Sequence, residues 1–246
     1  MYIKHTLSTL FIFACVLAAC GSQAATPATP EDQQRAVREI LRLGPGLDGV
    51  CSLAMYQVEC DSQGNVIKLD LSSNKMTNVR LETEQLTKLP PAIGKLTKLQ
   101  KLIIYGSSLT SLPPEIGQLM NLQELYLAFS PMTSLPPEIG QLINLQKLYL
   151  VGNPMTSLPP EIGQLINLQE LHLSINLTSL PPEIGQLTNL QRLELSNNQL
   201  ISLPPEIGQL TNLQYLFLNN NPLTNLPPEL CAKLKGVEIK PSGLCP

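Results

Sequence analysis

The stretch Leu180–Leu200, LPPEIGQLTNLQRLELSNNQL, decides the fold of this 246-residue chain. Its opening triplet, Leu-Pro-Pro, occurs seven times, with 23 residues from one copy to the next except for one step of 22. Self-similarity at a fixed period of this length predicts a solenoid, in which each coil of the chain stacks on the next. The copies start at Leu89, Leu112, Leu135, Leu158, Leu180, Leu203 and Leu226.

Each part of the repeat has a physical role in such a stack. In Leu193-Glu194-Leu195 the leucines alternate with a polar residue, so both leucines point to one side of a short strand. The Pro-Pro pair forces an extended segment, and the EIGQL sequence after it predicts a short helical or 3-10 turn. The asparagine behind the strand, Asn198 in this copy, can satisfy backbone groups where the chain leaves the sheet. We therefore expect a parallel sheet over a continuous leucine core.

The pattern L-x-x-L-x-L-x-x-N-x-L follows the Leu-Pro-Pro segments in the sequence, for example at Leu190–Leu200 and Leu213–Leu223. Over residues 66–240 the chain resembles the leucine-rich-repeat family. The resemblance implies an α/β solenoid, a leucine-rich-repeat horseshoe with short parallel strands on its concave face and about seven coils between terminal caps. The coils are expected to start at Met76, Leu99, Leu122, Leu145, Leu168, Leu190 and Leu213.

The chain is predicted to have five segments: a signal peptide (1–19), a tether (20–29), an N-terminal cap (30–75), the repeats (76–235) and a C-terminal cap (236–246). Residues 30–43 should form a helix with Thr29 as its N-cap. Val66–Leu71 has the pattern of a repeat strand, but it starts only 10 residues before Met76, too few for a full coil. We therefore expect a cap strand there, paired as a hairpin with Val79–Leu81, and a last strand over residues 234–239.

The first residues have the features of an export signal. Lys4 precedes an apolar stretch, Leu7–Ala19, that is too short for a membrane span; a buried core helix is the alternative. The junction Leu17-Ala18-Ala19-Cys20 resembles the bacterial lipobox, which implies that Cys20 is acylated and anchors the protein in the cell envelope. Because Gly21 follows in place of Asp, the resemblance favours the outer membrane over the inner one.

Four cysteines follow Cys20, the predicted lipidation site. They fit an exported protein, because an oxidising compartment favours disulfides. They form two close pairs, one at each end of the repeats, and allow three connectivities. A solenoid holds its ends apart, so we predict local pairing of Cys51 with Cys60 and of Cys231 with Cys245. The same separation argues against a four-cysteine zinc site.

The residues between the strand leucines should face the concave side, and they vary from coil to coil. Six of the seven aromatic residues outside the signal lie at such positions, and the seventh is Tyr56. Exposed apolar patches often mark binding sites, and tyrosine is a favoured interface anchor. The alternative is that neighbouring aromatic rings only stabilise the sheet. The central column of the face is predicted to read Arg80, Ile103, Tyr126, Tyr149, His172, Glu194 and Phe217. The residues predicted to contact a partner are Ile103, Tyr105, Tyr126, Phe129, Tyr149, Val151, His172, Tyr215 and Phe217.

Three other sets of positions lead to expectations. A second outward column should alternate in charge and form weak pairs: Asn78, Lys101, Glu124, Lys147, Glu170, Arg192 and Tyr215. A third outward position includes Phe129 and Ile175. In the asparagine column, Glu84, Ser107 and Ser130 replace Asn, which predicts looser turns. The fifth coil is one residue short at Asn176, and we place Asn176 in the asparagine column although Asn-Leu-Thr is also a glycosylation sequon.

The composition argues against several function classes. With a net charge of −3 and no basic stripe, the chain is not expected to bind nucleic acid. His172 is the only histidine outside the signal, and no serine or cysteine has an evident base beside it. The glycines are repeat positions, and no metal-ligand spacing of His and Cys occurs. We therefore expect no enzyme activity and no cofactor.

Together these features lead to one leading hypothesis and two alternatives. The leading one is a monomeric, protein-binding leucine-rich-repeat lipoprotein of the bacterial envelope that recognises a partner through its concave face. The first alternative is a surface lipoprotein that binds peptidoglycan or host glycans, with the tyrosines as stacking platforms. The second is a purely structural envelope protein.

Overall fold

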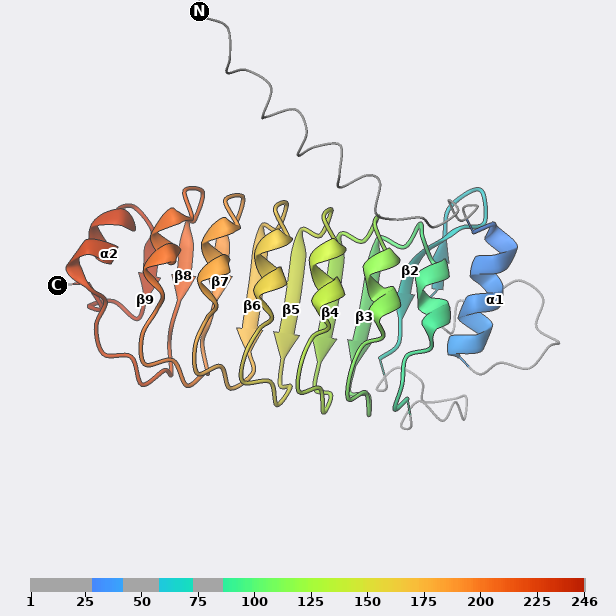
Figure 1. Cartoon of the computed structure of the whole chain (residues 1–246), viewed down its shortest axis with the longest axis horizontal. Helices are drawn as coiled ribbons and strands as arrows, with labels where there is room; N and C mark the ends of the chain where they lie inside the picture. The colour runs from blue at the N-terminus through green and yellow to red at the C-terminus, as the bar shows by residue number, and fades with distance from the viewer. Residues whose placement is uncertain (1–27, 42–57, 73–85, 246) are drawn as a thin grey trace, which may run out of the picture.

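The computed structural model describes residues 28–41, 58–72 and 86–245. Within them, nine strands form one open sheet in which each strand lies beside its neighbours in sequence (Figure 1). The strands from β2 onward are parallel, and only β1 runs antiparallel. The predicted parallel solenoid is therefore confirmed. The strands are β1 Val58–Cys60, β2 Val66–Asp70, β3 Lys101–Tyr105, β4 Glu124–Ala128, β5 Lys147–Val151, β6 Glu170–Ser174, β7 Arg192–Glu194, β8 Tyr215–Phe217 and β9 Glu238–Lys240.

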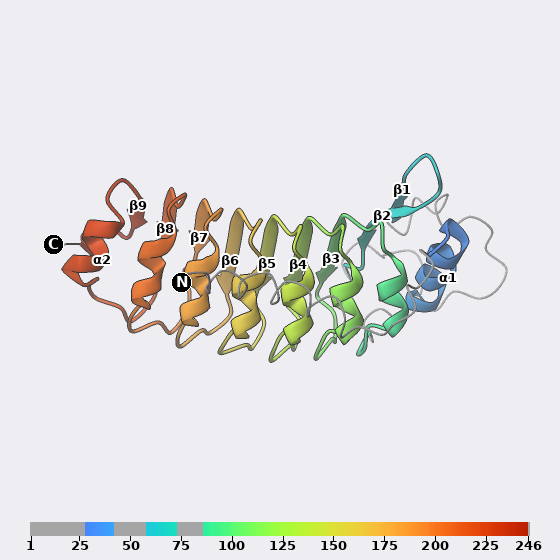
Figure 2. The ribbon, with the colours of Figure 1, turned by 45° about the horizontal axis from the view of Figure 1, so that its top comes forward.

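A layer of 3-10 turns covers one face of this sheet (Figure 2). Each turn starts at the second proline of a Leu-Pro-Pro triplet, where the fixed φ of proline suits a first helical position. The turns pack closely: a Cβ atom on Gly117 would lie 2.9 Å from the backbone carbonyl oxygen of Glu138 in the next coil, so the close spacing favours glycine. The turns are η5 Pro91–Lys95, η6 Pro114–Gln118, η7 Pro137–Gln141, η8 Pro160–Gln164, η9 Pro182–Gln186 and η10 Pro205–Gln209.

The core lies between the two layers and is formed by the repeated leucines and isoleucines. Leu125 and Leu127 of β4 are fully buried, as is Ile139 of the η7 turn. Burying one such side chain contributes roughly 1.5–3 kcal/mol. Because each coil buries its apolar face only against its neighbours, the stack as a whole stabilises every coil.

The asparagine column connects the turns behind the strands. Asn153 donates to the carbonyl of Leu127 one coil back at 2.9 Å, and its Oδ1 accepts from the backbone N–H of Ser130 at 3.1 Å. Ser107 and Ser130 are buried, and their hydroxyls are hydrogen-bonded to each other at 2.8 Å. The two hydroxyls thus connect neighbouring coils where asparagine is missing, and the predicted looseness of these turns stays a prediction. Glu84, the third replacement, lies outside the described residues.

The fifth coil differs from the prediction. Asn176 is exposed with φ of 91°, and Ile175 before it is buried in the inward position. One residue is missing from this turn, so the chain cannot place both an inward residue and an inward asparagine here. Asn198 of the next coil compensates by accepting from the backbone N–H groups of residues 175–177. The predicted places of Asn176 in the asparagine column and of Ile175 on the exposed face are both wrong.

The first parallel strand is β2, not a strand that starts near Met76. On one side β2 pairs with β1, with Glu59 opposite Lys68, and on the other side it pairs with β3, with Lys68 opposite Lys101. Both edges of β2 are occupied, so the predicted hairpin with Val79–Leu81 is wrong. The segment between Lys68 and Lys101 is longer than the 23-residue repeat, and residues 73–85 within it lie outside the described part of the chain. Lys68 and Asp70 consequently begin the two outward columns that were predicted to begin with Asn78 and Arg80.

The helix α1, Pro30–Ile40, covers the N-terminal end of the core. Thr29 and Asp32 form a capping box, which confirms the predicted N-cap. The buried Gln33 side chain donates to Asn65 and accepts from the backbone N–H of Val66, both at 3.1 Å. The start of α1 is thereby attached to the turn that leads into β2.

At the C-terminal end the helix α2, Pro228–Lys233, takes the place of a 3-10 turn. The last strand, β9, covers only the end of the predicted range 234–239. The predicted disulfide between Cys231 and Cys245 is confirmed. Cys60 is also disulfide-bonded. Its predicted partner Cys51 lies outside the described residues, so that pairing stays a prediction.

Candidate binding face

The side of the sheet that faces away from the 3-10 turns, hereafter the sheet face, carries the variable residues of the strands. In β4 and β5 the leucines are buried, whereas Tyr126 and Tyr149 point outward and are half-buried. The strand register places Ile103 beside Tyr126, Tyr126 beside Tyr149, and Tyr149 beside His172. Four predicted contact residues therefore form one row across β3 to β6.

Three rings of this row form a continuous stack. The ring centroids of Tyr126 and Tyr149 are 4.6 Å apart with an interplanar angle of 21°. Those of Tyr149 and His172 are 4.1 Å apart at 22°. Stacking follows from the strand separation of about 4.8 Å, which equals the usual distance between rings, and such pairs contribute roughly 0.5–1.5 kcal/mol each. The stack therefore stabilises the sheet as well as shaping its surface.

The tyrosine hydroxyls already have acceptors on the scaffold. Tyr126 donates to Glu124 at 3.1 Å, and Tyr149 donates to Glu170 of the next strand at 2.6 Å. Burial, followed by the charge of Glu124 and the hydrogen bond to it, raises the pKa of Tyr126 to about 12. Burial and the hydrogen bond to Glu170 also raise the pKa of Tyr149. Both rings remain neutral donors and are held in fixed orientations.

The predicted alternation of charge produces ion pairs beside the stack. Lys101 contacts Glu124 at 2.5 Å, and Lys147 contacts Glu170 at 3.0 Å. Burial opposes ionisation of Glu170, but the hydrogen bonds from Tyr149 and Lys147 outweigh it and hold its pKa below the usual value. These pairs are partly exposed, so each contributes roughly 0–1 kcal/mol and leaves this part of the face nearly neutral.

His172 ends the stack, and its side chain is half-buried. Burial lowers its pKa, and the nearby Arg192 cation lowers it further. Its Nε2 lies 3.8 Å from Glu170, too far for a hydrogen bond, and this buried atom has no hydrogen-bond partner. A polar atom in this state can accept or donate a hydrogen bond to a group that docks beside the stack.

Beside the stack, the exposed aromatic residues are Tyr105 and Phe129, hereafter the aromatic rim. Tyr105 is 37% exposed and Phe129 52% exposed, and their ring centroids are 5.0 Å apart. Phe129 has a φ of 52° at the turn behind β4. A Cβ atom on Gly152 would lie 2.7 Å from its ring, so the glycine provides the space in which the ring lies.

Tyr215 and Phe217 form a separate cluster on β8. Their ring centroids are 6.3 Å apart, and Arg192 of β7 lies over the Phe217 ring at 4.4 Å. Val151 of β5 is half-buried in the column beside the stack. The predicted contact residues thus fall into a main group on β3 to β6 and a second group at the end of the sheet.

The sequence reasoning missed another set of exposed apolar residues. Met120, Ile143 and Ile166 are exposed in the turns that lead into β4, β5 and β6, and Ile201 is exposed behind β7. The signal was the variable position x of GQLxNLQ, which is apolar in three successive coils and threonine in the two that follow.

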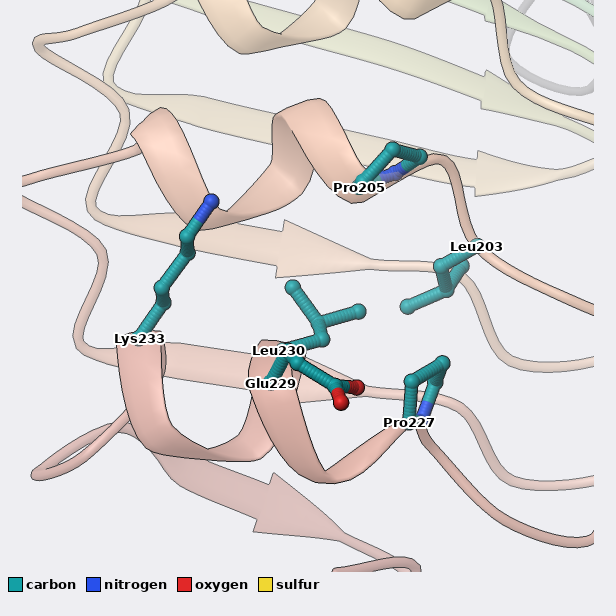
Figure 3. Close-up of a pocket in the computed structure, with 6 residues that line it drawn as sticks. All are labelled: Leu203, Pro205, Pro227, Glu229, Leu230 and Lys233. Atoms are coloured by element: carbon teal, nitrogen blue, oxygen red, sulfur yellow. The ribbon is translucent and has the colours of Figure 1, made fainter.

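A cavity of about 290 Å³ lies where α2 meets η10, away from the sheet face (Figure 3). There α2 replaces the regular 3-10 turn, and Lys233 takes the place that glutamine has beside the glycine of each earlier coil. The cavity is a consequence of this less regular packing at the end of the stack. It is lined by Leu203, Pro205, Pro227, Glu229, Leu230 and Lys233.

In the part of the chain that the structure describes, no group of three or more His, Cys, Asp or Glu side chains is placed to hold a metal ion. No helix in that part combines the length and apolar character needed to cross a membrane. Cys20, the predicted lipidation site, lies outside it.

Comparison with known families identifies the repeats. Residues 143–200 match the family described as leucine rich repeat, and residues 188–232 match the one described as leucine rich repeats in two copies. No curated protein matches the chain by sequence.

Solved structures share the architecture. A leucine-rich-repeat protein from Leptospira interrogans is 33% identical, covers 89% of this chain and 58% of its own length, and has a TM-score of 0.64. A chain of the Toll–Spätzle complex from Drosophila is 28% identical, with coverages of 63% and 22% and a TM-score of 0.57. The ectodomain of a plant receptor kinase from Arabidopsis thaliana, in complex with Casparian strip integrity factor 2, is 26% identical, with coverages of 83% and 32% and a TM-score of 0.54. This chain spans less than two thirds of each of these proteins.

Proposed function

We propose that this chain, a leucine-rich-repeat protein, is a non-enzymatic, monomeric scaffold that binds a partner protein through its sheet face. We also propose that a lipid on Cys20 holds it to the bacterial envelope. The observation that carries the proposal is the aromatic rim, because Tyr105 and Phe129 are neighbouring aromatic rings exposed on the sheet face. Two of the similar solved structures are of complexes with another protein, which is consistent with a protein partner.

The arrangement of the sheet face supports a division of roles. Tyr126 and Tyr149 are half-buried and bonded to glutamates, so they offer a rigid, flat floor. The rim beside this floor offers apolar area that loses water when a partner docks, and aromatic anchors of this kind often dominate binding energy. His172 Nε2 lies at the end of the floor and can accept one hydrogen bond from the partner or donate one to it.

The test is photo-crosslinking from the rim. A benzophenone side chain replaces Phe129 in the full chain, and the matched control carries it at Ile201, which is 74% exposed but lies outside the sheet face. We expect one protein adduct from envelope or host extract at position 129 and none of that mass at position 201. Identical adducts at both positions would contradict binding through the rim.

Two other outcomes would support the alternatives. Retention of the chain on peptidoglycan or a glycan array, lost in Tyr105→Ala, would indicate carbohydrate binding by the same aromatic residues. Altered envelope integrity on deletion of the protein, with neither a protein adduct nor glycan retention, would indicate a structural role.

The lipid anchor rests on the sequence Leu17-Ala18-Ala19-Cys20 and is tested separately. Radiolabelled palmitate should enter the wild-type chain but not Cys20→Ser, and the variant should move from the membrane to the soluble fraction. Density-gradient separation of the membranes then reports whether the outer membrane holds the protein, as Gly21 leads us to expect. Equal label in both variants would exclude Cys20 as the anchor.

A further inference from the structure

Three exposed apolar side chains form a row along one edge of the solenoid. Met120, Ile143 and Ile166 are 57%, 47% and 53% exposed, and they occupy the same repeat position in three successive coils. Each lies in the turn that leads into a strand, on the upper edge in Figure 1, hereafter the leading edge. These three side chains are named the apolar ridge.

Hydrogen bonds fix the ridge in place. The asparagine after each ridge residue donates to the carbonyl of the turn one coil back: Asn144 to Met120 at 2.7 Å, and Asn167 to Ile143 at 2.8 Å. The turns are therefore direct neighbours, and their tips cannot fold inward. A fixed row of exposed apolar side chains raises the question of what covers it.

The edge has little charge along the ridge. The segments 118–123, 141–146 and 164–169 contain no charged residue, so removing them from water has no ionic cost. The neighbouring coil on the same edge has two exposed cations, Lys95 and Lys98, and their charges act on the carboxylates of Asp32 and Asp61. Apolar tips next to a zone with charges of both signs fit a lipid surface, in which polar headgroups cover an apolar layer.

The start of the described chain points to the same edge. Ala28 accepts from Gln33, and Gln33 is bonded to Asn65 and Val66 at the turn leading into β2. The chain from Cys20 thus joins the fold at the leading edge. Seven residues lie between Cys20 and Ala28, and the eight steps from one Cα atom to the next span at most roughly 29 Å, which limits how far this edge can lie from a lipid attached to Cys20.

We infer that the apolar ridge docks onto the lipid surface of the membrane to which the chain is anchored, so that the leading edge faces the bilayer and the aromatic rim faces away from it. This inference rests on the proposed anchor at Cys20. Three side chains bind a membrane weakly by themselves, but an anchor makes their contact intramolecular and raises their effective concentration at the surface. The ridge therefore orients the protein, whereas the lipid holds it.

A second copy of the chain is a poorer occupant of the ridge. A stable interface buries about 800 Å² on each partner, far more than three half-exposed side chains provide. The side chains that flank the ridge in the adjacent coils are Thr97 and Thr188, which do not extend the apolar area.

The chain has no tryptophan, so a single introduced one reports its own surroundings. We propose to place the acylated full chain in vesicles of phosphatidylethanolamine and phosphatidylglycerol that contain brominated lipid, which quenches tryptophan only on contact. The reporter variant is Ile143→Trp, in a turn before a strand. The matched control is Ile201→Trp, in a turn after a strand and so at the other edge of the solenoid. Circular dichroism checks that both variants fold, and mass spectrometry of the N-terminal peptide checks that Cys20 is acylated.

Quenching of Ile143→Trp at least twofold above that of Ile201→Trp supports the inference. Adding Met120→Thr and Ile166→Thr should reduce the quenching, because both substitutions remove apolar area from the ridge. The turn should still form with threonine: the N–H groups of Thr188 and Thr211 donate to the carbonyl two residues before, as that of Ile143 does. An acylated chain without quenching overturns the ridge proposal alone, and an unacylated chain overturns the anchor together with it. A blue shift that depends on protein concentration and lacks lipid quenching would assign the ridge to a second copy and overturn the membrane proposal.

Discussion

The two sides of the strand β5 differ in what they do for the protein. Leu148 and Leu150 point inward, are fully buried and recur in almost every coil. Tyr149 lies between these leucines in the sequence and Val151 follows them. Both point outward, and the residue type at each of these positions varies from coil to coil. The comparison shows that the constant core and the variable surface are encoded at alternate positions of the same short segment, because successive side chains in a strand point to opposite faces.

The largest expected effect tests the inward side. Leu148→Ala should destabilise the protein by roughly 2–5 kcal/mol, because it leaves a cavity between coils that the regular stack cannot close. Val151→Ala, three residues further along and on the outward side, should cost about 1 kcal/mol or less. Urea unfolding followed by circular dichroism measures both. Equal losses would contradict the assignment of the two sides.

A second test compares an inward asparagine with an outward one. Asn198→Ala removes a side chain that donates to Leu173 and accepts from the turn of the fifth coil, and it leaves several buried backbone groups unpaired. We expect a loss of roughly 1–3 kcal/mol or more in the free energy of unfolding. Asn176→Gly, at the exposed position with positive φ, should be nearly neutral because glycine adopts that conformation freely. A similar loss in both variants would contradict the exposed placement of Asn176 and would support its place in the asparagine column.

Which parts of the structure could be predicted depends on how periodic the sequence is. The strands, the 3-10 turns and the row of Ile103, Tyr126, Tyr149 and His172 follow from the repeat, because each position is confirmed by several copies. The places that failed are those where the period breaks. The irregular stretch of sequence before Lys101 and the short coil at Asn176 each occur in one copy only, and the pairing of β2 with β3 and the backbone at Asn176 depend on contacts that the sequence does not display.

The candidate site illustrates the same limit in another way. The sequence locates Tyr105 and Tyr126 on one face, but it does not reveal that Tyr105 is exposed whereas Tyr126 is bonded to Glu124. The ridge residues were missed because they lie outside the L-x-L pattern that defines the strand. Attention to every variable position of the repeat, in the turns as well as in the strands, would have found them.

A smaller effect distinguishes the floor of the sheet face from its exposed end. Tyr149→Phe removes the hydroxyl that donates to Glu170 at 2.6 Å and should cost about 1 kcal/mol. Tyr215→Phe removes a hydroxyl from a more exposed ring, and we expect no measurable change. Thermal unfolding of the two variants under identical conditions gives the comparison. If Tyr149→Phe unfolds like the wild type, the stack is not held by its hydroxyl and the floor is less rigid than proposed.

The smallest expected effect concerns the pH dependence of stability at the end of the stack. Burial and the cations of Arg192 and Lys147 lower the pKa of His172 from its usual 6.5, although Glu170 and Glu194 act in the opposite direction. The unfolded chain therefore binds more protons in the range just below pH 6.5, so the contribution of His172 to stability is complete above that pH and is lost as the pH falls. Between about pH 7.5 and 5.5, above the range in which glutamates usually titrate, the wild type should lose more stability than His172→Gln. The slopes of the two unfolding free energies against pH are compared, which cancels the constant cost of removing the ring. Parallel slopes would show that the imidazole is free to become charged and that the stack does not confine it.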